Sequence, residues 1–139
     1  MASGFWWAGS LDHSEPIKAP YTVKASAVLS KGEMLNLESS EADAAATNDK
    51  GLIGVAVHDV DNTADGEIVY AIMNPGAIYG VEDANARTAG TLLDIATGGM
   101  GVTTSTNADL IVVYDSADDE PTLVAFNNSH YLNRVTPGS

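Results

Sequence analysis

The chain has 139 residues, of which 45% are hydrophobic, and this is enough apolar material for the core of one domain. Six Lys and Arg against 19 Asp and Glu give a formal net charge of −13 at pH 7, which argues against nucleic acid and membranes as partners because both surfaces are negatively charged. The absence of cysteine excludes disulfide frameworks, thiolate zinc sites and cysteine nucleophiles.

The first twenty residues have no sustained strand or helix period, so residues 1–20 are expected to form an extended arm and residues 21–139 a single β domain. The arm carries Phe5 and the adjacent pair Trp6 and Trp7. Successive side chains of an extended segment point to opposite sides, so the domain would bury one tryptophan and leave the other for a partner. No Lys or Arg precedes these aromatics and no long apolar run follows, so neither a secretory signal nor a membrane span is expected.

The apolar arm is the strongest candidate for a contact with another protein, because tryptophan is enriched at binding hot spots. The candidate contact residues are Phe5, Trp6, Trp7 and Leu11. The alternative is that these aromatics cap the core of their own domain.

After the arm, the chain consists of short β-like runs separated by turn residues. Alternating residues 22–29 and a turn at Lys31-Gly32 come before a run at 34–37. The apolar run at 52–60 surrounds Gly54, which indicates a β-bulge or a close backbone contact. Further runs are expected at 67–73, 77–81, 92–95, 110–114 and 123–126.

The run at 67–73 is apolar on both of its faces, which suits either an interior strand or a strand at a subunit interface. Ile68, Tyr70 and Ile72 share one face and are the candidate residues for contact between copies of the chain.

Only residues 38–46 and 82–89 combine helix formers without β-branched runs, and each would make about two turns. The sequence therefore predicts an all-β fold, a small barrel or a sandwich, with one or two short helices and an extended N-terminal arm.

No motif for catalysis or metal binding is complete. An acidic loop beginning at Asp61 resembles a calcium loop in part, but its twelfth position is Ile72, where a bidentate Glu is required. The three histidines, His13, His58 and His130, lack any metal-binding spacing. We expect no catalytic residue, no metal site, no cofactor and no enzymatic activity.

Four short runs occur in a characteristic order: P-Y at 20–21, K-G-E-M-L at 31–35, I-G-V-A at 53–56 and N-P-G-A at 74–77. In this order they resemble the decoration, or cement, proteins of tailed-bacteriophage heads and their prophage relatives. The resemblance covers roughly residues 20–95.

The resemblance implies a β-barrel or β-tulip domain that assembles as a homotrimer and binds the major capsid protein on the outer surface of the virion. During assembly the protein would be in the host cytoplasm. Two alternatives stay open: another virion component, such as a tail or spike protein, and a β-barrel that binds a small molecule or carbohydrate. In the second alternative, Trp6, Tyr70, Tyr79 and Tyr114 would supply stacking surfaces.

Overall fold

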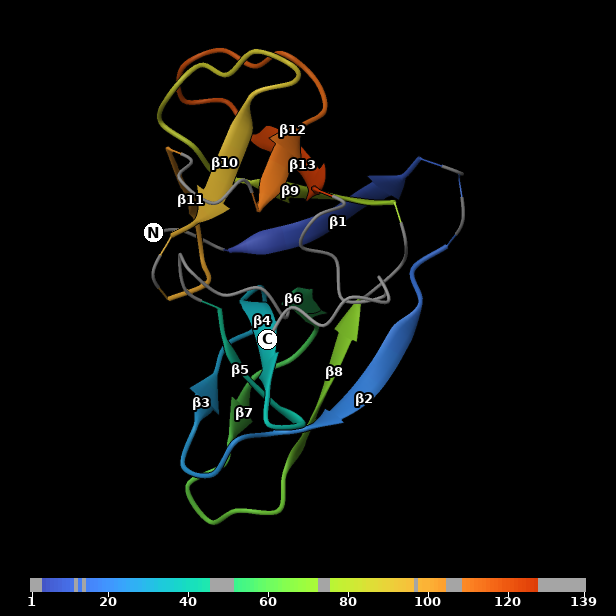
Figure 1. Ribbon diagram of the computed structural model, residues 1–139, viewed down its shortest axis with the longest axis vertical. Helices are drawn as coiled ribbons and strands as arrows, with labels where there is room; N and C mark the ends of the chain where they lie inside the picture. The colour runs from blue at the N-terminus through green and yellow to red at the C-terminus, as the bar shows by residue number, and fades with distance from the viewer. Residues whose placement is uncertain are drawn as a thin grey trace.

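The computed structural model describes residues 4–11, 13, 15–45, 52–72, 76–96, 98–104 and 109–127, and every regular element in these ranges is a β-strand (Figure 1). The strands are β1 (Phe5–Ser10), β2 (Lys18–Thr22), β3 (Val28–Leu29), β4 (Met34–Glu38), β5 (Glu41–Ala44), β6 (Leu52–Ala56), β7 (Val60–Asp61), β8 (Ile68–Ile72), β9 (Ala77–Val81), β10 (Leu92–Ile95), β11 (Val102–Thr104), β12 (Leu110–Val112) and β13 (Thr122–Phe126). The predicted all-β class is confirmed. In this part of the chain there is no helix that is long and apolar enough to cross a membrane.

The strands form two large open sheets and a small one. The six-stranded sheet has the order β1-β9-β13-β12-β10-β11, the five-stranded sheet has the order β2-β8-β6-β4-β5, and β3 pairs with β7. Figure 1 shows the two large sheets in opposite halves of the molecule. Neither sheet closes on itself, because the first and last strands in each order are not paired with each other. The barrel alternative is therefore wrong, and the protein consists of packed open sheets.

One face of the six-stranded sheet packs against the five-stranded sheet around a shared core. Tyr79 is fully buried there, and its hydroxyl donates a hydrogen bond to the carbonyl oxygen of Ile72 at 2.8 Å, which joins β9 to β8. Each large side chain buried in this way contributes about 2 kcal/mol of transfer free energy. The buried members are Phe5, Met34, Ala45, Leu52, Val55, Ile72, Ala77, Tyr79, Val81, Leu93, Ile95, Leu110, Val112 and Val124.

The opposite face of the five-stranded sheet covers a second core, which β3 and β7 close. Its buried members are Val23, Leu29, Leu35, Ala42, Ile53, Ala56, Val60, Val69 and Ala71. Strand β6 supplies both cores, because Leu52 faces the shared core and Ile53 faces the second core. The register shifts between Leu35 opposite Gly54 and Asn36 opposite Leu52, with Gly54 at φ 146°. The predicted irregularity at Gly54 is thus confirmed as a bulge.

The expected helix at residues 38–46 is wrong, since the described part of this segment is a hairpin. Strand β4 ends at Glu38, and Ser39 and Ser40 turn the chain with φ angles of 51° and 70° before β5 returns. Pairing between β4 and β5 overrides a helix propensity that is worth only a few tenths of a kcal/mol per residue. Ala46 lies outside the described residues.

Two further segments differ from the predicted elements. Residues 82–89, expected as a helix, form a loop in which Arg87 bridges to Ser116. Residues 22–29, expected as one strand, are interrupted by a turn at which Ser26 adopts a φ of 66°. A second strand therefore starts only at Val28 and pairs with β7.

Residues 1–20, expected as an extended arm, contribute two strands to the sheets. Strand β1 pairs antiparallel with β9, and β2 pairs antiparallel with β8. Pro20 lies in β2, which is an edge strand, where the missing amide hydrogen can face away from the sheet. The six residues of β1 and the five of β2 are too few to establish a period in the sequence, but they suffice to pair with the edge of an existing sheet.

Candidate docking surface

The side chains of β1 alternate between the shared core and the opposite side of the six-stranded sheet. Phe5 is only 2% exposed and belongs to the shared core, and Trp7 packs against that core. Trp6 points the other way and is 36% exposed. The prediction that the two tryptophans face opposite sides is confirmed, whereas Phe5 is wrong as a partner contact because the fold itself buries it.

Trp6 lies directly over Gly80, its partner on β9. A Cβ atom at Gly80 would come within 2.3 Å of Cε2 of the indole ring, so the ring occupies the space that a side chain would take. An aromatic ring over a cross-strand glycine restores contacts that the glycine lacks. Trp6 therefore stabilises its own sheet on one side of the ring and presents the other side to solvent.

The side of the six-stranded sheet that faces away from the shared core carries apolar residues on five neighbouring strands, and we call it the outer face. Cross-strand partners form two rows, Leu92, Ile111, Ala125 and Ile78 in the first, and Val113, Leu123, Gly80 and Trp6 in the second. None of these positions carries a charge. Leu92 is 40% exposed, close to the exposure of Trp6.

A shallow depression of about 350 Å³ opens on the outer face next to the end of β1. Its lining is uncharged and consists of Leu11, Gly90, Ile111, Val112, Val113, Ala125, Phe126 and Asn127. Leu11 is 63% exposed and follows directly after β1. Two of the four predicted contact residues, Trp6 and Leu11, are thus exposed on this side of the sheet.

The second predicted contact set lies on β8 in the five-stranded sheet. Ile68 and Tyr70 are 46% and 41% exposed, but Ile72 is 8% exposed and part of the shared core. Ile72 is therefore wrong as an interface residue, because the end of β8 runs beneath the six-stranded sheet. The backbone N–H of Tyr70 donates to Nε2 of His58 at 3.1 Å, and this bond fixes His58 beside the exposed pair.

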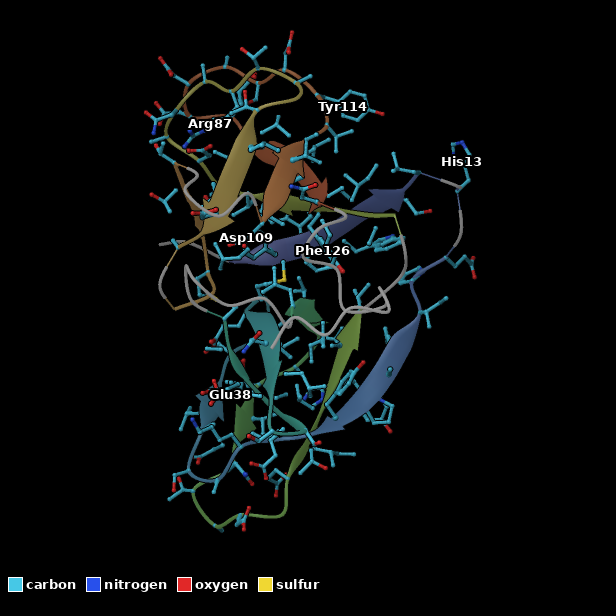
Figure 2. The ribbon with its side chains drawn as sticks, in the orientation of Figure 1. His13, Glu38, Arg87, Asp109, Tyr114 and Phe126 are labelled. Atoms are coloured by element: carbon cyan, nitrogen blue, oxygen red, sulfur yellow. The ribbon has the colours of Figure 1, made fainter. Side chains whose placement is uncertain are left out.

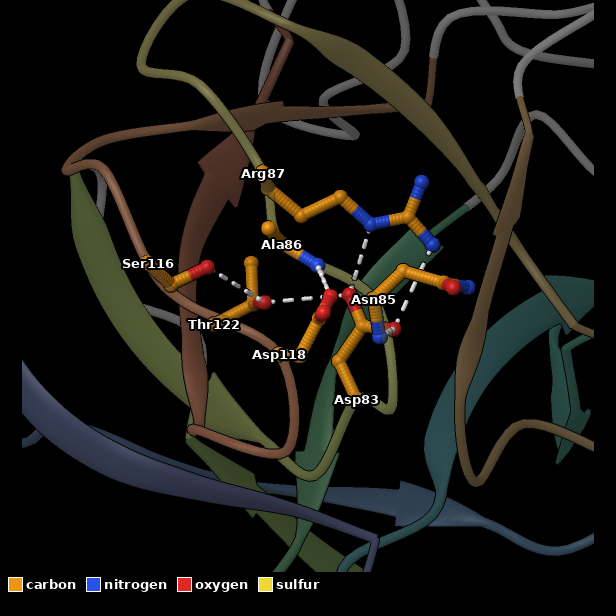
Figure 3. A network of polar contacts seen from close by, with 7 residues as sticks. All are labelled: Asp83, Asn85, Ala86, Arg87, Ser116, Asp118 and Thr122. Atoms are coloured by element: carbon orange, nitrogen blue, oxygen red, sulfur yellow. Dashed lines mark hydrogen bonds and ion pairs between the residues drawn. The ribbon is translucent and has the colours of Figure 1, made fainter.

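A polar network fastens the loops at one end of the six-stranded sheet (Figure 3). Asp83 accepts a hydrogen bond from Nε of Arg87 at 2.7 Å and another from the hydroxyl of Thr122 at 3.0 Å. The backbone N–H of Ala86 donates to Asp118 at 2.8 Å, which ties the loop after β9 to the loop after β12. Figure 2 shows Arg87 and Tyr114 at this end of the molecule and Glu38 in the opposite half.

Two buried carboxyl groups have shifted pKa values in opposite directions. Burial works to raise the pKa of Asp83, but the hydrogen bonds from the side chains of Arg87 and Thr122 and from the backbone N–H of Asn85, together with the charge of Arg87, outweigh it and hold that pKa below its usual range. Burial raises the pKa of Glu33, although this carboxyl accepts the N–H of Ser30. Both groups are structural, since their contacts lie within the protein.

The carboxylates in and beside the acidic loop that resembles a calcium site accept hydrogen bonds from backbone N–H groups. Asp61 accepts the N–H of Thr63 at 3.0 Å, Asp65 accepts the N–H of Gly66 at 2.9 Å, and Asp59 accepts the N–H of Lys31 at 2.7 Å. Among the described residues no group of three or more His, Cys, Asp and Glu side chains is placed to hold a metal ion. His130 lies outside the described residues.

The outer face is the feature that sequence reasoning missed. Its residues come from five strands between residues 5 and 126, and the available signal was weak: strands β10, β12 and β13 are too short to show which side is buried. Leu92 and Ile111 become neighbours only through strand pairing.

No protein-family model matches the chain, and no curated protein sequence matches it. Among solved structures, the chain is similar to the N base of head fiber gp8.5 of bacteriophage phi29, with a TM-score of 0.56 and 19% sequence identity. The match covers 82% of this chain and 98% of that chain. At this level of identity the likeness shows a shared fold alone.

Proposed function

We propose that this chain is a structural component of a bacteriophage head and performs no catalysis. The observation that carries the proposal is the likeness in fold to the N base of a phage head fiber, which extends over 98% of that chain. The resemblance of residues 20–95 to head decoration proteins points to the same class independently, because it rests on sequence runs and the likeness rests on strand arrangement.

The finer proposal is that the protein decorates the outer surface of the capsid and contacts the major capsid protein through Trp6 and Leu11. An exposed apolar patch on an otherwise acidic protein fits a docking role, since the charge keeps the free protein soluble and the patch supplies the contact. A protein that binds the assembled shell and not the free subunit stabilises the shell by mass action. Many identical sites on one particle make weak individual contacts sufficient.

We further propose that copies of the chain associate as a homotrimer through Ile68 and Tyr70. Both side chains are exposed and adjacent on one face of β8, while their neighbour Ile72 is already used by the shared core. Sedimentation equilibrium tests this: the wild type is expected at three times the mass of the I68S/Y70S variant, and a wild-type monomer at all concentrations and on the particle contradicts it.

A carbohydrate-binding role has less support. The sheets are open, and Tyr79, one of the aromatics considered for stacking, is fully buried. The depression on the outer face is lined by Phe126 and by none of Trp6, Tyr70 and Tyr114. A stacking site needs exposed aromatic faces in one place.

The test of the proposed function is the composition of purified particles of the phage that encodes the chain. Quantitative mass spectrometry of gradient-purified virions is expected to find this protein in a fixed ratio to the major capsid protein. Particles from a gene-deletion phage are expected to recover that ratio when purified protein is added. A chain that is absent from wild-type particles, or that varies with the extent of washing, contradicts the proposal.

A further inference from the structure

The charge around the outer face is strongly one-sided. Residues 77–127, which contain five of the six strands of this sheet, hold eight acidic residues and a single basic one, a net charge of −7. The basic residue, Arg87, is already engaged by Asp83 at 2.7 Å. The outer face therefore combines an uncharged centre with acidic surroundings and no available cation in the described part of this segment.

Five of the eight acidic residues are exposed, and they lie in the loops that follow β9 and β12. The other three are Asp94 and Asp109, which are fully buried in the sheet, and Asp83, which pairs with Arg87. Val113 lines the depression, and Asp115 follows it by two positions. Gly90, which also lines the depression and donates its N–H to the carbonyl oxygen of Val112 at 2.8 Å, closes the loop that begins after β9. The exposed carboxylates of these two loops form what we call the acidic rim: Glu82, Asp115, Asp118, Asp119 and Glu120.

The rim is held in place, so its charges keep a fixed position relative to the apolar rows. Asp115 accepts the N–H of Ala89 at 2.8 Å, Asp118 accepts the N–H of Ala86 at 2.8 Å, and Glu120 accepts the N–H of Ala117 at 2.9 Å. Fixed charges of one sign near an apolar centre select a partner with the opposite sign at its own periphery.

We propose that the outer face docks a protein surface that is apolar at its centre and carries Lys and Arg at its edge, and that the docking residues include Leu92, Ile111 and Leu123 besides Trp6. This inference rests on the proposed function, under which that surface belongs to the capsid shell. A second copy of the chain is a poorer occupant, because it would bring a second acidic rim against the first.

The experiment uses phage heads purified from a deletion mutant and measures co-sedimentation of the full-length protein over a range of salt concentrations. Wild-type affinity is expected to fall at least roughly tenfold between about 0.05 M and about 0.5 M NaCl, since salt screens attraction between opposite charges. The variants W6A and L92S are expected to weaken binding at least roughly tenfold each. The control V28S, at an exposed apolar residue of β3 in the other half of the molecule, is expected to weaken it less than about twofold.

A matched pair of double variants separates the rim from net charge. D119N/E120Q neutralises two rim carboxylates, and D65N/E67Q neutralises two in the other half of the molecule. Asp119 and Asp65 have φ angles of 60° and 63°, a conformation that Asn tolerates, so neither change strains the backbone. We expect the rim variant to lose about fivefold in affinity and part of its salt dependence, and the control to change less than about twofold.

The outcomes distinguish the two proposals. Wild-type protein that fails to bind heads contradicts the proposed function and the inference together. Binding that is kept in W6A and L92S contradicts the inference alone, and so does an equal loss of binding in V28S. Equal effects of the two charge variants, or a dimer in sedimentation equilibrium that L92S disrupts, also contradict it, the second because the occupant would then be another copy of this chain.

Discussion

The five-stranded sheet buries apolar side chains on both faces within the protein, whereas the six-stranded sheet buries one face and leaves part of the other exposed, at Trp6 and Leu92. In β6, Leu52 enters the shared core and Ile53 the second core, and both are at most 1% exposed. In β10, Leu93 is buried in the shared core while Leu92 is 40% exposed on the outer face. Strands that are apolar on both sides are thus buried on both sides in one sheet and on only one side in the other. Only the exposed apolar face is available to a partner.

The largest expected effect separates the two faces of a single strand, β1. F5A removes a core side chain and is expected to cost about 3–5 kcal/mol of unfolding free energy. W6A removes a half-exposed ring and is expected to cost about 1 kcal/mol or less. Deletion of residues 1–10 would remove β1 and expose the edge of β9, so it is expected to prevent stable folding.

Urea denaturation followed by circular dichroism measures these changes. Similar losses of unfolding free energy for F5A and W6A would show that β1 does not have one buried face and one exposed face in solution. A stable truncated protein would show that β1 is dispensable for the fold.

The positions of many strands along the chain were accessible from the sequence, because β-rich runs such as 52–56 and 77–81 follow turn residues. Their order in the sheets was not. The errors have a common cause. Ser39 and Ser40 turn the chain where helix formers surround them. The segment is a hairpin because β4 pairs with β5, and local propensity does not show this pairing.

The candidate site was accessible only in part. Opposite orientation of Trp6 and Trp7 follows from strand geometry, and the structure agrees. Burial of Phe5 and Ile72 depends on how the two sheets pack, and the rows of the outer face depend on pairing between strands far apart in the chain, such as Trp6 of β1 with Gly80 of β9. Neither kind of contact has a local signal in the chain.

The second expected effect concerns the loops at the end of the six-stranded sheet. D83N removes the charge that pairs with Arg87, whose side chain is 13% exposed, and is expected to cost about 3 kcal/mol at pH 7. Because the pKa of Asp83 is lowered in the folded protein, its contribution is complete above the unfolded value of about 4 and is lost as the pH falls through the folded pKa.

Thermal denaturation between neutral and acidic pH is the measurement. The difference between wild type and D83N is expected to shrink below about pH 4. N85A, an exposed control in the same loop, is expected to follow the wild-type curve. A stability difference between wild type and D83N that is the same at every pH would show that the charge of Asp83 is not its cause.

A smaller effect of opposite sign is expected in the five-stranded half. Burial raises the pKa of Glu33, so this group favours folding most below its unfolded value of about 4.3 and least above its folded pKa. E33Q keeps an acceptor for the N–H of Ser30 and is expected to stabilise the protein by up to about 1 kcal/mol at pH 7 and by nothing near pH 3. The exposed control E67Q is expected to change neither value, and destabilisation by E33Q at pH 7 would contradict the argument.

The smallest expected effect tests the contact between Trp6 and Gly80. G80A places a methyl group where the indole ring lies and is expected to displace the ring, with a red shift of tryptophan fluorescence in a W7F background. The ring can swing toward solvent, so the loss of stability is expected to be only about 1 kcal/mol. G101A, where the nearest atom is 3.9 Å from the added Cβ, is the matched control. Unchanged emission in G80A would mean that Trp6 does not cover Gly80 in solution.

We propose that the outer face of the six-stranded sheet is the side that meets a phage head. A cryo-electron microscopy map of heads carrying this protein tests it directly. We expect density for the chain on the shell, with Trp6, Leu92 and Ile111 buried against it and the acidic rim beside Lys or Arg side chains of the shell. A map in which the outer face points to solvent and Ile68 and Tyr70 meet the shell would contradict it.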